Sequence, residues 1–498
     1  MKRLSGLDAS FLYLETPILH MHVSMAAVFD PSTVSGGYSF DKVRDLVSSR
    51  LSLAPVFRRK LVEVPFRLGH PYWVDDPAFD ITYHLRRVAL PVPGNLAQLA
   101  EMVGDICSRQ LDRSKPLWEM YVVEGLEGGN IALITKIHHA TIDGVSGAEL
   151  LTELFDLEPD PPPRKPVSPP DTDGAVPSGM ALVTQALAAR LVRPVEVTKL
   201  AWRTGRAVLD VRRIRQGPGA GRAALPLTAP RTSINASITG RRKVVFASTS
   251  LDDAKRLKRA MGTTVNDVVL AVCAGALRQF LLVGNELPDQ PLVATVPVSV
   301  QPSTHQVPGS NKISAMWVAL PSHIADPLER LAAIHDSTKD AKQEHQALGA
   351  DVLQDWAEHA TPNLFSAAVR AYTRLKLAEH HRPIYTLIVS NVPGPDFPLY
   401  FGGAEMVAGF PLGPIMDGAG LNITVMSYRG VLNWGIMACP DALPGVGDIA
   451  SGIPTALDEL MQAAGLGPAT LAGIAPGPPP RGRSRKTGAR ASSRPART

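Results

Sequence analysis

The stretch from residue 131 to residue 147, IALITKIHHATIDGVSG, limits the possible folds more than any other part of the chain. It begins with a largely apolar run whose side chains would alternate between two faces, as they do in a β-strand. His138 and His139 are therefore predicted to point in opposite directions. Two such rings cannot act on one substrate atom, so one imidazole would perform chemistry while the other supports it.

The residues after this pair predict a sharp turn and then a helix. Gly144 tolerates positive φ, and Asp143 can hydrogen-bond to nearby backbone N–H groups. Ser146 and Glu149 have the spacing of a capping box, and apolar residues then recur at helical spacing up to Phe155. The sequence thus predicts a strand, two histidines at its end, a tight turn and a helix.

A histidine at a strand end is well placed for proton transfer, because an unperturbed imidazole has a pKa of about 6.5. A lone histidine on an apolar strand is more often a packed residue with one hydrogen bond. This pair is followed, after three residues, by Asp143-Gly144. A second pair, His380-His381, has no Asp-Gly at that spacing, and we assign it no function.

Length and composition indicate a large globular protein. The 498 residues exceed what one core usually covers, so two or more domains are expected. Hydrophobic residues make up 45% and charged residues 19%, which is ordinary for a folded chain. The net charge is +5, but residues 481–497 carry seven positive charges and no acid, so the remainder carries −2. This balance argues against a nucleic-acid enzyme.

The cysteines and apolar runs indicate a cytoplasmic protein. Cys107, Cys273 and Cys439 lie far apart and form no CxxC motif, as expected in a reducing compartment. The N-terminus lacks the unbroken apolar run of a secretion signal. The longest apolar runs, such as 268–277, are about half of the ~20 residues that a membrane-spanning helix needs. Any membrane or lipid-body association is therefore expected to be peripheral.

Changes in composition divide the chain into four parts. We expect an N-terminal domain at 1–157, a linker with basic helices at 158–240, a C-terminal domain at 241–465 and a disordered basic tail at 466–498.

The basic segment 180–215 allows two interpretations. It can form helices that pack across the body of the protein. Alternatively, it can be a basic amphipathic surface that lies on anionic lipid, and Trp202 with Arg203 and Arg206 is compatible with this second interpretation.

Periodicity predicts alternating helices and strands elsewhere in the chain. Strands are expected at 21–29, 72–74, 81–88, 120–124, 292–300, 312–320, 385–390, 422–428 and 431–437. Helices are expected at 40–51, 96–109, 252–261 (with an Asp cap), 263–280, 327–342 and 353–380, the last interrupted near Pro362.

A second motif opens the helix expected at 263–280. Thr264 and Asp267 have the spacing of a capping box, which accounts fully for the aspartate. Such a box does not require Asn266, whose amide could serve as a donor within an active site.

Several motifs in a fixed order resemble one known family. They are LDASFLYLE near the start, Pro116-Leu117-Trp118, His138-His139 with Asp143-Gly144, Asn266-Asp267, Ser390-Asn391-Val392-Pro393-Gly394-Pro395 and Leu421-Asn422-Ile423-Thr424-Val425. The histidine motif is similar to HHxxxDG of the CoA-dependent acyltransferases. The whole set, over about residues 4 to 460, resembles the bacterial wax ester synthase/diacylglycerol acyltransferase family.

This resemblance implies an α/β fold of two domains similar to chloramphenicol acetyltransferase. Each domain would hold a mixed sheet with flanking helices, and the active site would lie in a tunnel between the domains. Acyl-CoA would approach from one side and the lipid acceptor from the other.

The resemblance also implies roles for individual residues. His139 would be the general base, His138 its support, and Asp143 with Gly144 would shape the loop that holds the base. Residues implied to line or brace the substrate site are Leu117, Trp118, Asn266, Asp267, Ser390 and Asn391.

The implied reaction is transfer of a long acyl chain from acyl-CoA to the hydroxyl of diacylglycerol, with no metal and no cofactor beyond acyl-CoA. Three alternatives stay open. The acceptor could be a fatty alcohol, which would give a wax ester, or the chain could be a catalytically silent lipid-binding protein of this fold. A hydrolase is the third, although no GxSxG motif or activated cysteine is present to supply a nucleophile.

Overall fold

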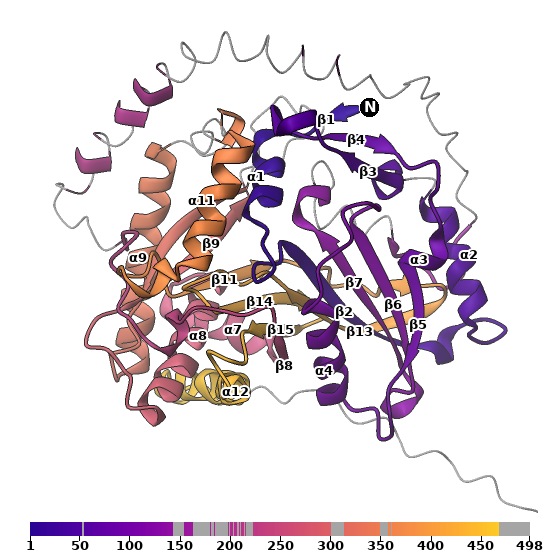
Figure 1. Cartoon of the computed structure of the whole chain (residues 1–498). Coiled ribbons are helices and arrows are strands. Elements are labelled where there is room, and N and C mark those ends of the chain that lie inside the picture. The colour runs from indigo at the N-terminus through magenta and orange to yellow at the C-terminus, as the bar shows by residue number, and fades with distance from the viewer. Residues whose placement is uncertain are drawn as a thin grey trace, which may run out of the picture.

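The computed structural model describes residues 1–51, 54–142, 154–162, 223–299, 313–348, 357–359 and 361–467, together with scattered positions between 180 and 215. Within these residues the strands form two six-stranded sheets and one three-stranded sheet. Helices pack on both large sheets, and the N-terminal and C-terminal halves of the chain lie side by side (Figure 1). This is the mixed α/β architecture that the sequence predicts.

The N-terminal half alternates short helices and strands, with η denoting a 3-10 helix. Its elements are β1 (Lys2–Arg3), α1 (Gly6–Leu14), β2 (His22–Asp30), η1 (Pro31–Thr33), α2 (Phe40–Leu51), η2 (Pro55–Arg58), β3 (Arg59–Val62), η3 (Pro65–Arg67), β4 (Tyr72–Asp75), α3 (Ile81–His84), β5 (Leu85–Ala89), α4 (Leu96–Cys107), β6 (Trp118–Glu124), η4 (Glu127–Gly129), β7 (Ile131–His138) and η5 (His139–Ile142).

The C-terminal half has longer helices. Its elements are η6 (Ser233–Asn235), β8 (Lys243–Ser250), α7 (Leu251–Met261), α8 (Val265–Val283), β9 (Leu292–Ser299), β10 (Ile313–Leu320), α9 (Pro327–Leu348), α11 (Pro362–Arg374), η7 (Leu377–Glu379), β11 (Leu387–Val392), β12 (Tyr400–Phe401), β13 (Ala404–Leu412), β14 (Leu421–Tyr428), β15 (Val431–Ala438) and α12 (Val446–Ala463).

The N-terminal sheet has the strand order β12-β13-β2-β7-β6-β5. β7 lies inside it, antiparallel to both β2 and β6, and every one of its eight residues is buried. A strand covered on both faces carries a nearly continuous apolar run, which is what the sequence of β7 shows. The predicted strand is confirmed, and its C-terminal end is the place where the histidine pair lies.

The C-terminal sheet has the order β10-β9-β11-β14-β15-β8. α8 packs against α12 and α9 over this sheet. By length and composition α8 could span a membrane, but 67% of its apolar window is buried inside the fold, as in the core helix of a globular domain.

The C-terminal half adds two strands to the N-terminal sheet. β13 lies far along the chain, yet it pairs antiparallel with β2 and adds β12 to the edge of the N-terminal sheet. Figure 1 shows these orange strands among the purple strands of the N-terminal half. The two halves are therefore interlocked, and the predicted domain limits stay a prediction.

Two expectations about secondary structure need correction. Residues 81–84 form a helical turn capped by Asp80, and the strand begins only at Leu85. The cap of α7 is Ser250, whose hydroxyl accepts from the N–H of Asp253, and not an aspartate. Periodicity also gave no indication of β8, β13 or α12, whose burial depends on partners from distant parts of the chain.

Several predicted features lie wholly or largely outside the described residues. These are the helix after Gly144, most of the linker with its basic segment and nearly all of the tail. In the basic segment, Trp202 is exposed and the guanidinium of Arg206 lies 4.3 Å from the centre of its ring. Both interpretations of that segment stay predictions.

Candidate active site

The strand that carries the histidines ends one residue earlier than predicted. β7 stops at His138, and His139 begins the 3-10 turn η5. The backbone N–H of His139 donates to the carbonyl of Met21 at 2.8 Å, which ties the turn to the start of β2. His139 is therefore placed by a tight turn at the end of a rigid, buried strand.

The ring of His139 is held by α1. It stacks on Phe11 with ring centroids 3.9 Å apart and an angle of 19° between the planes. α1 also packs against η5 and against α11, so it lies between the proposed base and the C-terminal half. Figure 1 shows α1 and α11 side by side near the top of the molecule.

His139 is set up to be neutral at physiological pH. Desolvation, together with the nearby His138, lowers its pKa to about 4. The residue nevertheless keeps part of its surface accessible, and its Nδ1 atom is buried with no partner among the described residues. An imidazole that is unprotonated and still reachable can accept a proton from a bound substrate.

His138 is buried beside the turn, and its predicted role as the support of the base stays a prediction. Its side chain is 1% exposed. Its Nδ1 atom accepts a hydrogen bond from the backbone N–H of Ala140 at 3.1 Å. His138 therefore acts on the same turn that carries His139, and its Nε2 atom lies 3.7 Å from a carboxylate oxygen of Glu15.

Leu117 and Trp118 are fully buried, and their predicted role in lining or bracing the substrate site stays a prediction. The carbonyl of Leu117 accepts the backbone N–H of His138 at 3.0 Å. Trp118 donates its Nε1–H to the carbonyl of Phe57 at 2.7 Å, and its ring stacks on His84. A buried tryptophan usually needs such a hydrogen-bond partner, so this residue fixes the packing behind β7.

Asp143 and Gly144 lie outside the described residues. Their predicted role in shaping the loop next to His139 stays a prediction.

Asn266 and Asp267 lie at the start of α8. The capping box is confirmed: Asp267 N–H donates to the hydroxyl of Thr264 at 3.2 Å, and Thr264 N–H donates to Asp267 Oδ2 at 2.9 Å. The same Oδ2 lies 2.8 Å from Nδ1 of His335, a contact that sequence reasoning missed. Asn266 is partly buried. The role of either residue in binding substrate stays a prediction.

Ser390 and Asn391 lie in β11, where the C-terminal sheet opens. β11 pairs with β14 from Ile388 to Val392, but its described pairing with β9 covers only Leu387 and Ile388. The two strands therefore separate beside Ser390 and Asn391, whose predicted role in lining or bracing the substrate site stays a prediction.

Gly394, just beyond β11, is required by close packing. A Cβ atom at this position would lie 2.1 Å from the carbonyl oxygen of Ser427. The glycine in the Ser390–Pro395 motif thus lets the chain pass over β14 before it crosses to the N-terminal sheet.

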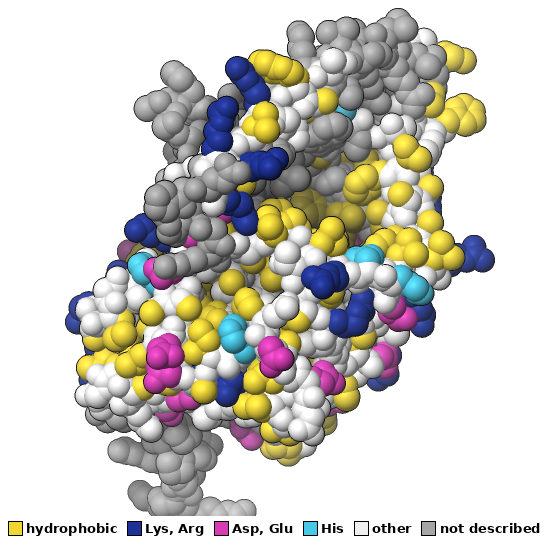
Figure 2. Space-filling view, turned by 90° about the vertical axis from the view of Figure 1, so that its left-hand side faces the viewer, with side chains coloured by type: hydrophobic (Ala, Val, Ile, Leu, Met, Phe, Trp, Pro, Cys, Tyr) yellow, Lys and Arg dark blue, Asp and Glu magenta, His cyan; other side chains and the backbone are white. Residues whose placement is uncertain are grey.

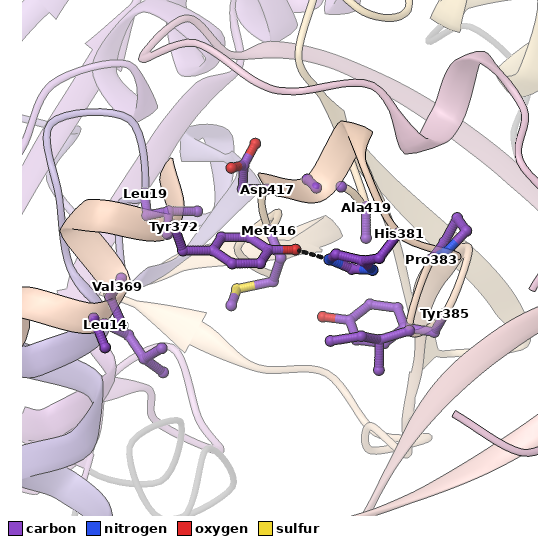
Figure 3. A pocket seen from close by; sticks show the side chains of 14 residues that line it. Leu14, Leu19, Val369, Tyr372, His381, Pro383, Tyr385, Met416, Asp417 and Ala419 are labelled. Carbon is purple, nitrogen blue, oxygen red and sulfur yellow. Dashed lines mark hydrogen bonds between the residues drawn. The ribbon is translucent and has the colours of Figure 1, made fainter. Parts of the chain in front are cut away.

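An apolar cavity of about 370 Å³ lies between the two halves (Figure 3). Its walls include Leu14 and Leu19 from the N-terminal half and Val369, Tyr372, Tyr385 and Met416 from the C-terminal half. Leu14 follows Phe11 by one helical turn, so the two side chains lie on the same side of α1. The cavity wall is thus adjacent to the ring that contacts His139.

Polar groups lie at the edge of this cavity. The hydroxyl of Tyr372 lies 2.7 Å from Nε2 of His381, shown by the dashed line in Figure 3. Burial raises the pKa of Asp417 and of Tyr385. The second histidine pair, to which the sequence assigns no function, therefore contributes one ring to the cavity wall.

Three functional candidates lacked a role in the sequence prediction: Phe11, Glu15 and Arg113. Phe11 and Glu15 belong to the LDASFLYLE motif, which contributed to the resemblance but suggested no chemistry. Among the described residues, no group of three or more His, Cys, Asp or Glu side chains is arranged to hold a metal ion.

Comparisons with known proteins show which family this chain belongs to. The model of the wax ester synthase/diacylglycerol acyltransferase catalytic domain matches residues 4–269, and that of the WS/DGAT C-terminal domain matches residues 309–461. A Mycobacterium tuberculosis (strain CDC 1551 / Oshkosh) protein named "Putative diacyglycerol O-acyltransferase MT1809" is 43% identical over 464 residues, which are 93% of this chain and 90% of the relative.

Two solved structures share the fold. The wax ester synthase/diacylglycerol acyltransferase from Marinobacter aquaeolei VT8 is 30% identical with a TM-score of 0.64, covering 93% of this chain and all of that one. The starter condensation domain of rhizomide synthetase is 14% identical with a TM-score of 0.51, covering 93% and 94% of the two chains, a likeness of fold alone. The predicted fold is confirmed, and the chain belongs to the wax ester synthase/diacylglycerol acyltransferase family.

Proposed function

We propose that this protein transfers a long acyl chain from acyl-CoA to the free hydroxyl of diacylglycerol. One observation carries the proposal: a neutral, partly accessible His139 at the end of a buried strand, stacked on Phe11, which lies one turn of α1 from Leu14 in the wall of an apolar cavity between the two halves. The names of the relatives support the same chemistry.

In this mechanism His139 is the general base. An alcohol has a pKa far above neutrality, so it attacks well only as its proton is removed. His139 takes the hydroxyl proton while the oxygen bonds to the thioester carbonyl carbon. The tetrahedral intermediate then collapses, the C–S bond breaks, and the imidazolium returns the proton to the departing CoA sulfur. General base catalysis of this kind contributes roughly 10²- to 10⁴-fold.

The apolar cavity supports a lipid substrate. Leu14, Leu19, Val369 and Met416 offer the lining that an alkyl chain requires, because burying each CH₂ group contributes about 0.8 kcal/mol. On the face shown in Figure 2, hydrophobic side chains also line a hollow in the upper half of the molecule. We therefore place one chain of a substrate in the cavity and its reacting group near His139.

An assay of the purified protein tests this function. It would be incubated with palmitoyl-CoA and either dioleoylglycerol, hexadecanol or water alone, while CoA release is followed and the lipids are separated. We expect triacylglycerol from the first mixture. If wax ester forms from hexadecanol and no triacylglycerol forms from dioleoylglycerol, the acceptor is a fatty alcohol. Free palmitate in every mixture would favour a hydrolase. Lipid binding without CoA release from any mixture would contradict an enzymatic role.

We also propose that the protein works in the cytoplasm, at a membrane or lipid-body surface, with no cofactor beyond acyl-CoA. The insolubility of its lipid substrate supports a peripheral position. Two exposed apolar side chains, Phe66 (82% exposed) and Leu364 (72% exposed), are compatible with it, and a hydrogen bond from Asn363 to the carbonyl of Phe66 joins the segments that carry them. Flotation with vesicles of mixed neutral and anionic lipid would test this placement, and a protein that stays at the bottom of the gradient would contradict it.

A further inference from the structure

A buried carboxylate lies behind the histidine pair. Glu15 follows the last residue of α1, and its side chain is only 2% exposed. Its Oε2 atom accepts from Arg113 twice, from Nε at 2.9 Å and from Nη2 at 2.7 Å. Nη2 of Arg113 also donates to the carbonyl of Leu12 at 2.7 Å. Arg113 thus fixes Glu15 at the C-terminal end of α1.

The hydrogen bonds of His138 determine which of its nitrogens carries the proton. Nδ1 accepts from the N–H of Ala140, so it carries no hydrogen. The neutral ring must then be protonated at Nε2, which is buried, lies 3.7 Å from Glu15 Oε2 and has no hydrogen-bond partner among the described residues. A closing movement of less than ~1 Å would make this contact a hydrogen bond.

Glu15 is ionised in the folded protein. Burial alone would raise its pKa, but His138 and Arg113 outweigh that effect and lower the pKa to about 2. The charged or titratable groups that act on the neighbouring His22 are Lys136, His20, His138 and Arg242, none of which is an acid. Another acid, Glu119, lies with its Oε2 atom 3.7 Å from Nζ of Lys136. Glu15 is the carboxylate that lies next to His138.

We propose that Glu15, held by Arg113, is a positioning residue for acyl transfer, because it keeps His138 in the Nε2–H tautomer. That tautomer leaves Nδ1 free to accept the N–H of Ala140 and so fixes the turn that carries His139. This inference rests on the proposed function of His139 as the base. Without the carboxylate, the other tautomer becomes available, the buried N–H of Ala140 loses its acceptor, and the turn is less well defined.

Kinetics of two Glu15 variants test the proposal. Glu15→Gln keeps the shape and removes the charge, and Glu15→Ala removes both. Because a misplaced base loses rate rather than substrate affinity, we expect kcat to fall about 10-fold for Gln and about 100-fold for Ala, with KM changed less than about 2-fold. Arg113→Lys, which keeps the positive charge, should retain more kcat than Arg113→Met.

A matched control separates positioning from simple stability. Arg50 and Asp156 form another buried ion pair in the N-terminal half, with oxygens 2.5 and 2.6 Å from Nη2. Asp156→Asn should lower the melting temperature and leave kcat unchanged. A kcat loss in Asp156→Asn equal to that in Glu15→Gln would overturn the proposal, as would wild-type kcat in Glu15→Ala.

The tautomer itself can be observed. In protein labelled with ¹⁵N-histidine, long-range ¹H–¹⁵N spectra distinguish the two neutral tautomers, and the signal of His138 is assigned by its loss in His138→Asn. We expect the Nε2–H form in the wild type and a mixture or the Nδ1–H form in Glu15→Ala. An unchanged tautomer in Glu15→Ala would overturn the inference. A wild type without turnover would overturn the proposed function instead, since this spectrum needs no activity.

Discussion

The two histidine pairs of this chain share a dipeptide and little else. His138 and His139 end a fully buried strand, and desolvation lowers the pKa of His139 to about 4. His380 and His381 follow the short helix η7 at the surface. Both ring nitrogens of His381 have partners, Tyr372 Oη and the carbonyl of Arg382, whereas Nδ1 of His139 has none among the described residues.

This difference teaches what makes a histidine a candidate base. The residue type is the same in both pairs, so the surroundings of each ring decide whether it can act as a base. A ring whose nitrogens are both occupied by neighbours cannot take a substrate proton without first breaking a hydrogen bond. A ring held by aromatic stacking, as His139 is held by Phe11, has a fixed orientation without that cost.

The largest expected effect is the loss of His139. We expect His139→Ala to lower kcat by roughly 10²- to 10⁴-fold, because Nδ1 of the neighbouring His138 already accepts the N–H of Ala140 and cannot take over as the base. His138→Ala should be less damaging. Steady-state CoA release from palmitoyl-CoA and dioleoylglycerol measures both, and circular dichroism checks that the variants are folded. Equal activity of the wild type and His139→Ala would remove the catalytic distinction between the pairs.

The pH dependence follows from the lowered pKa of His139. Its base form predominates above pH 4, so kcat/KM should stay level from about pH 8 down to about pH 5 and fall tenfold per unit below about pH 4. An unperturbed histidine would give an acid limb near pH ~6.5. Initial rates between pH 3.5 and 8, ~0.5 units apart, with circular dichroism at each pH, distinguish the two cases. A fall in kcat/KM that begins near pH ~6.5 would mean that the base is not desolvated.

The apolar cavity near His381 should set chain preference. Ala368 is exposed at its wall, so Ala368→Trp should narrow the entrance without disturbing the core. We expect kcat/KM for substrates with a hexadecyl chain to fall about 10-fold relative to those with a butyl chain. Ala371→Trp is the control, because Ala371 is exposed on the same helix and does not line the cavity. An equal effect of both substitutions would place the chain elsewhere.

The smallest expected effect belongs to the exposed member of the second pair. Among the described residues, the hydrogen bond of the His380 ring is to its local backbone, with Nδ1 3.1 Å from the carbonyl of Lys376. His380→Ala should therefore change kcat by less than about 2-fold and the free energy of unfolding by less than about 0.5 kcal/mol. A substantial loss of activity would show that the second pair has a role in the reaction although His380 lies at the surface.

Local sequence patterns determined much of the fold. The bounds of α2, the strand β7 and the capping box of α8 follow from side-chain periodicity and from residues three apart, which act within one element. The motif HHxxxDG likewise identified the candidate base. Such features depend on interactions between neighbours in the sequence, so they can be read before any tertiary contact is known.

The tertiary structure alone decided the remainder. It joined β13 to β2 and brought Arg113 to Glu15 across 98 residues of chain. It also desolvated His139 while leaving its ring partly accessible, and it placed His380 at the surface and His381 in the wall of the apolar cavity. Burial and long-range pairing cause these differences, and both are properties of the packed chain. The sequence by itself therefore identified the residue that can act as base, and the fold determined why that residue, and not an identical one elsewhere, is prepared to do so.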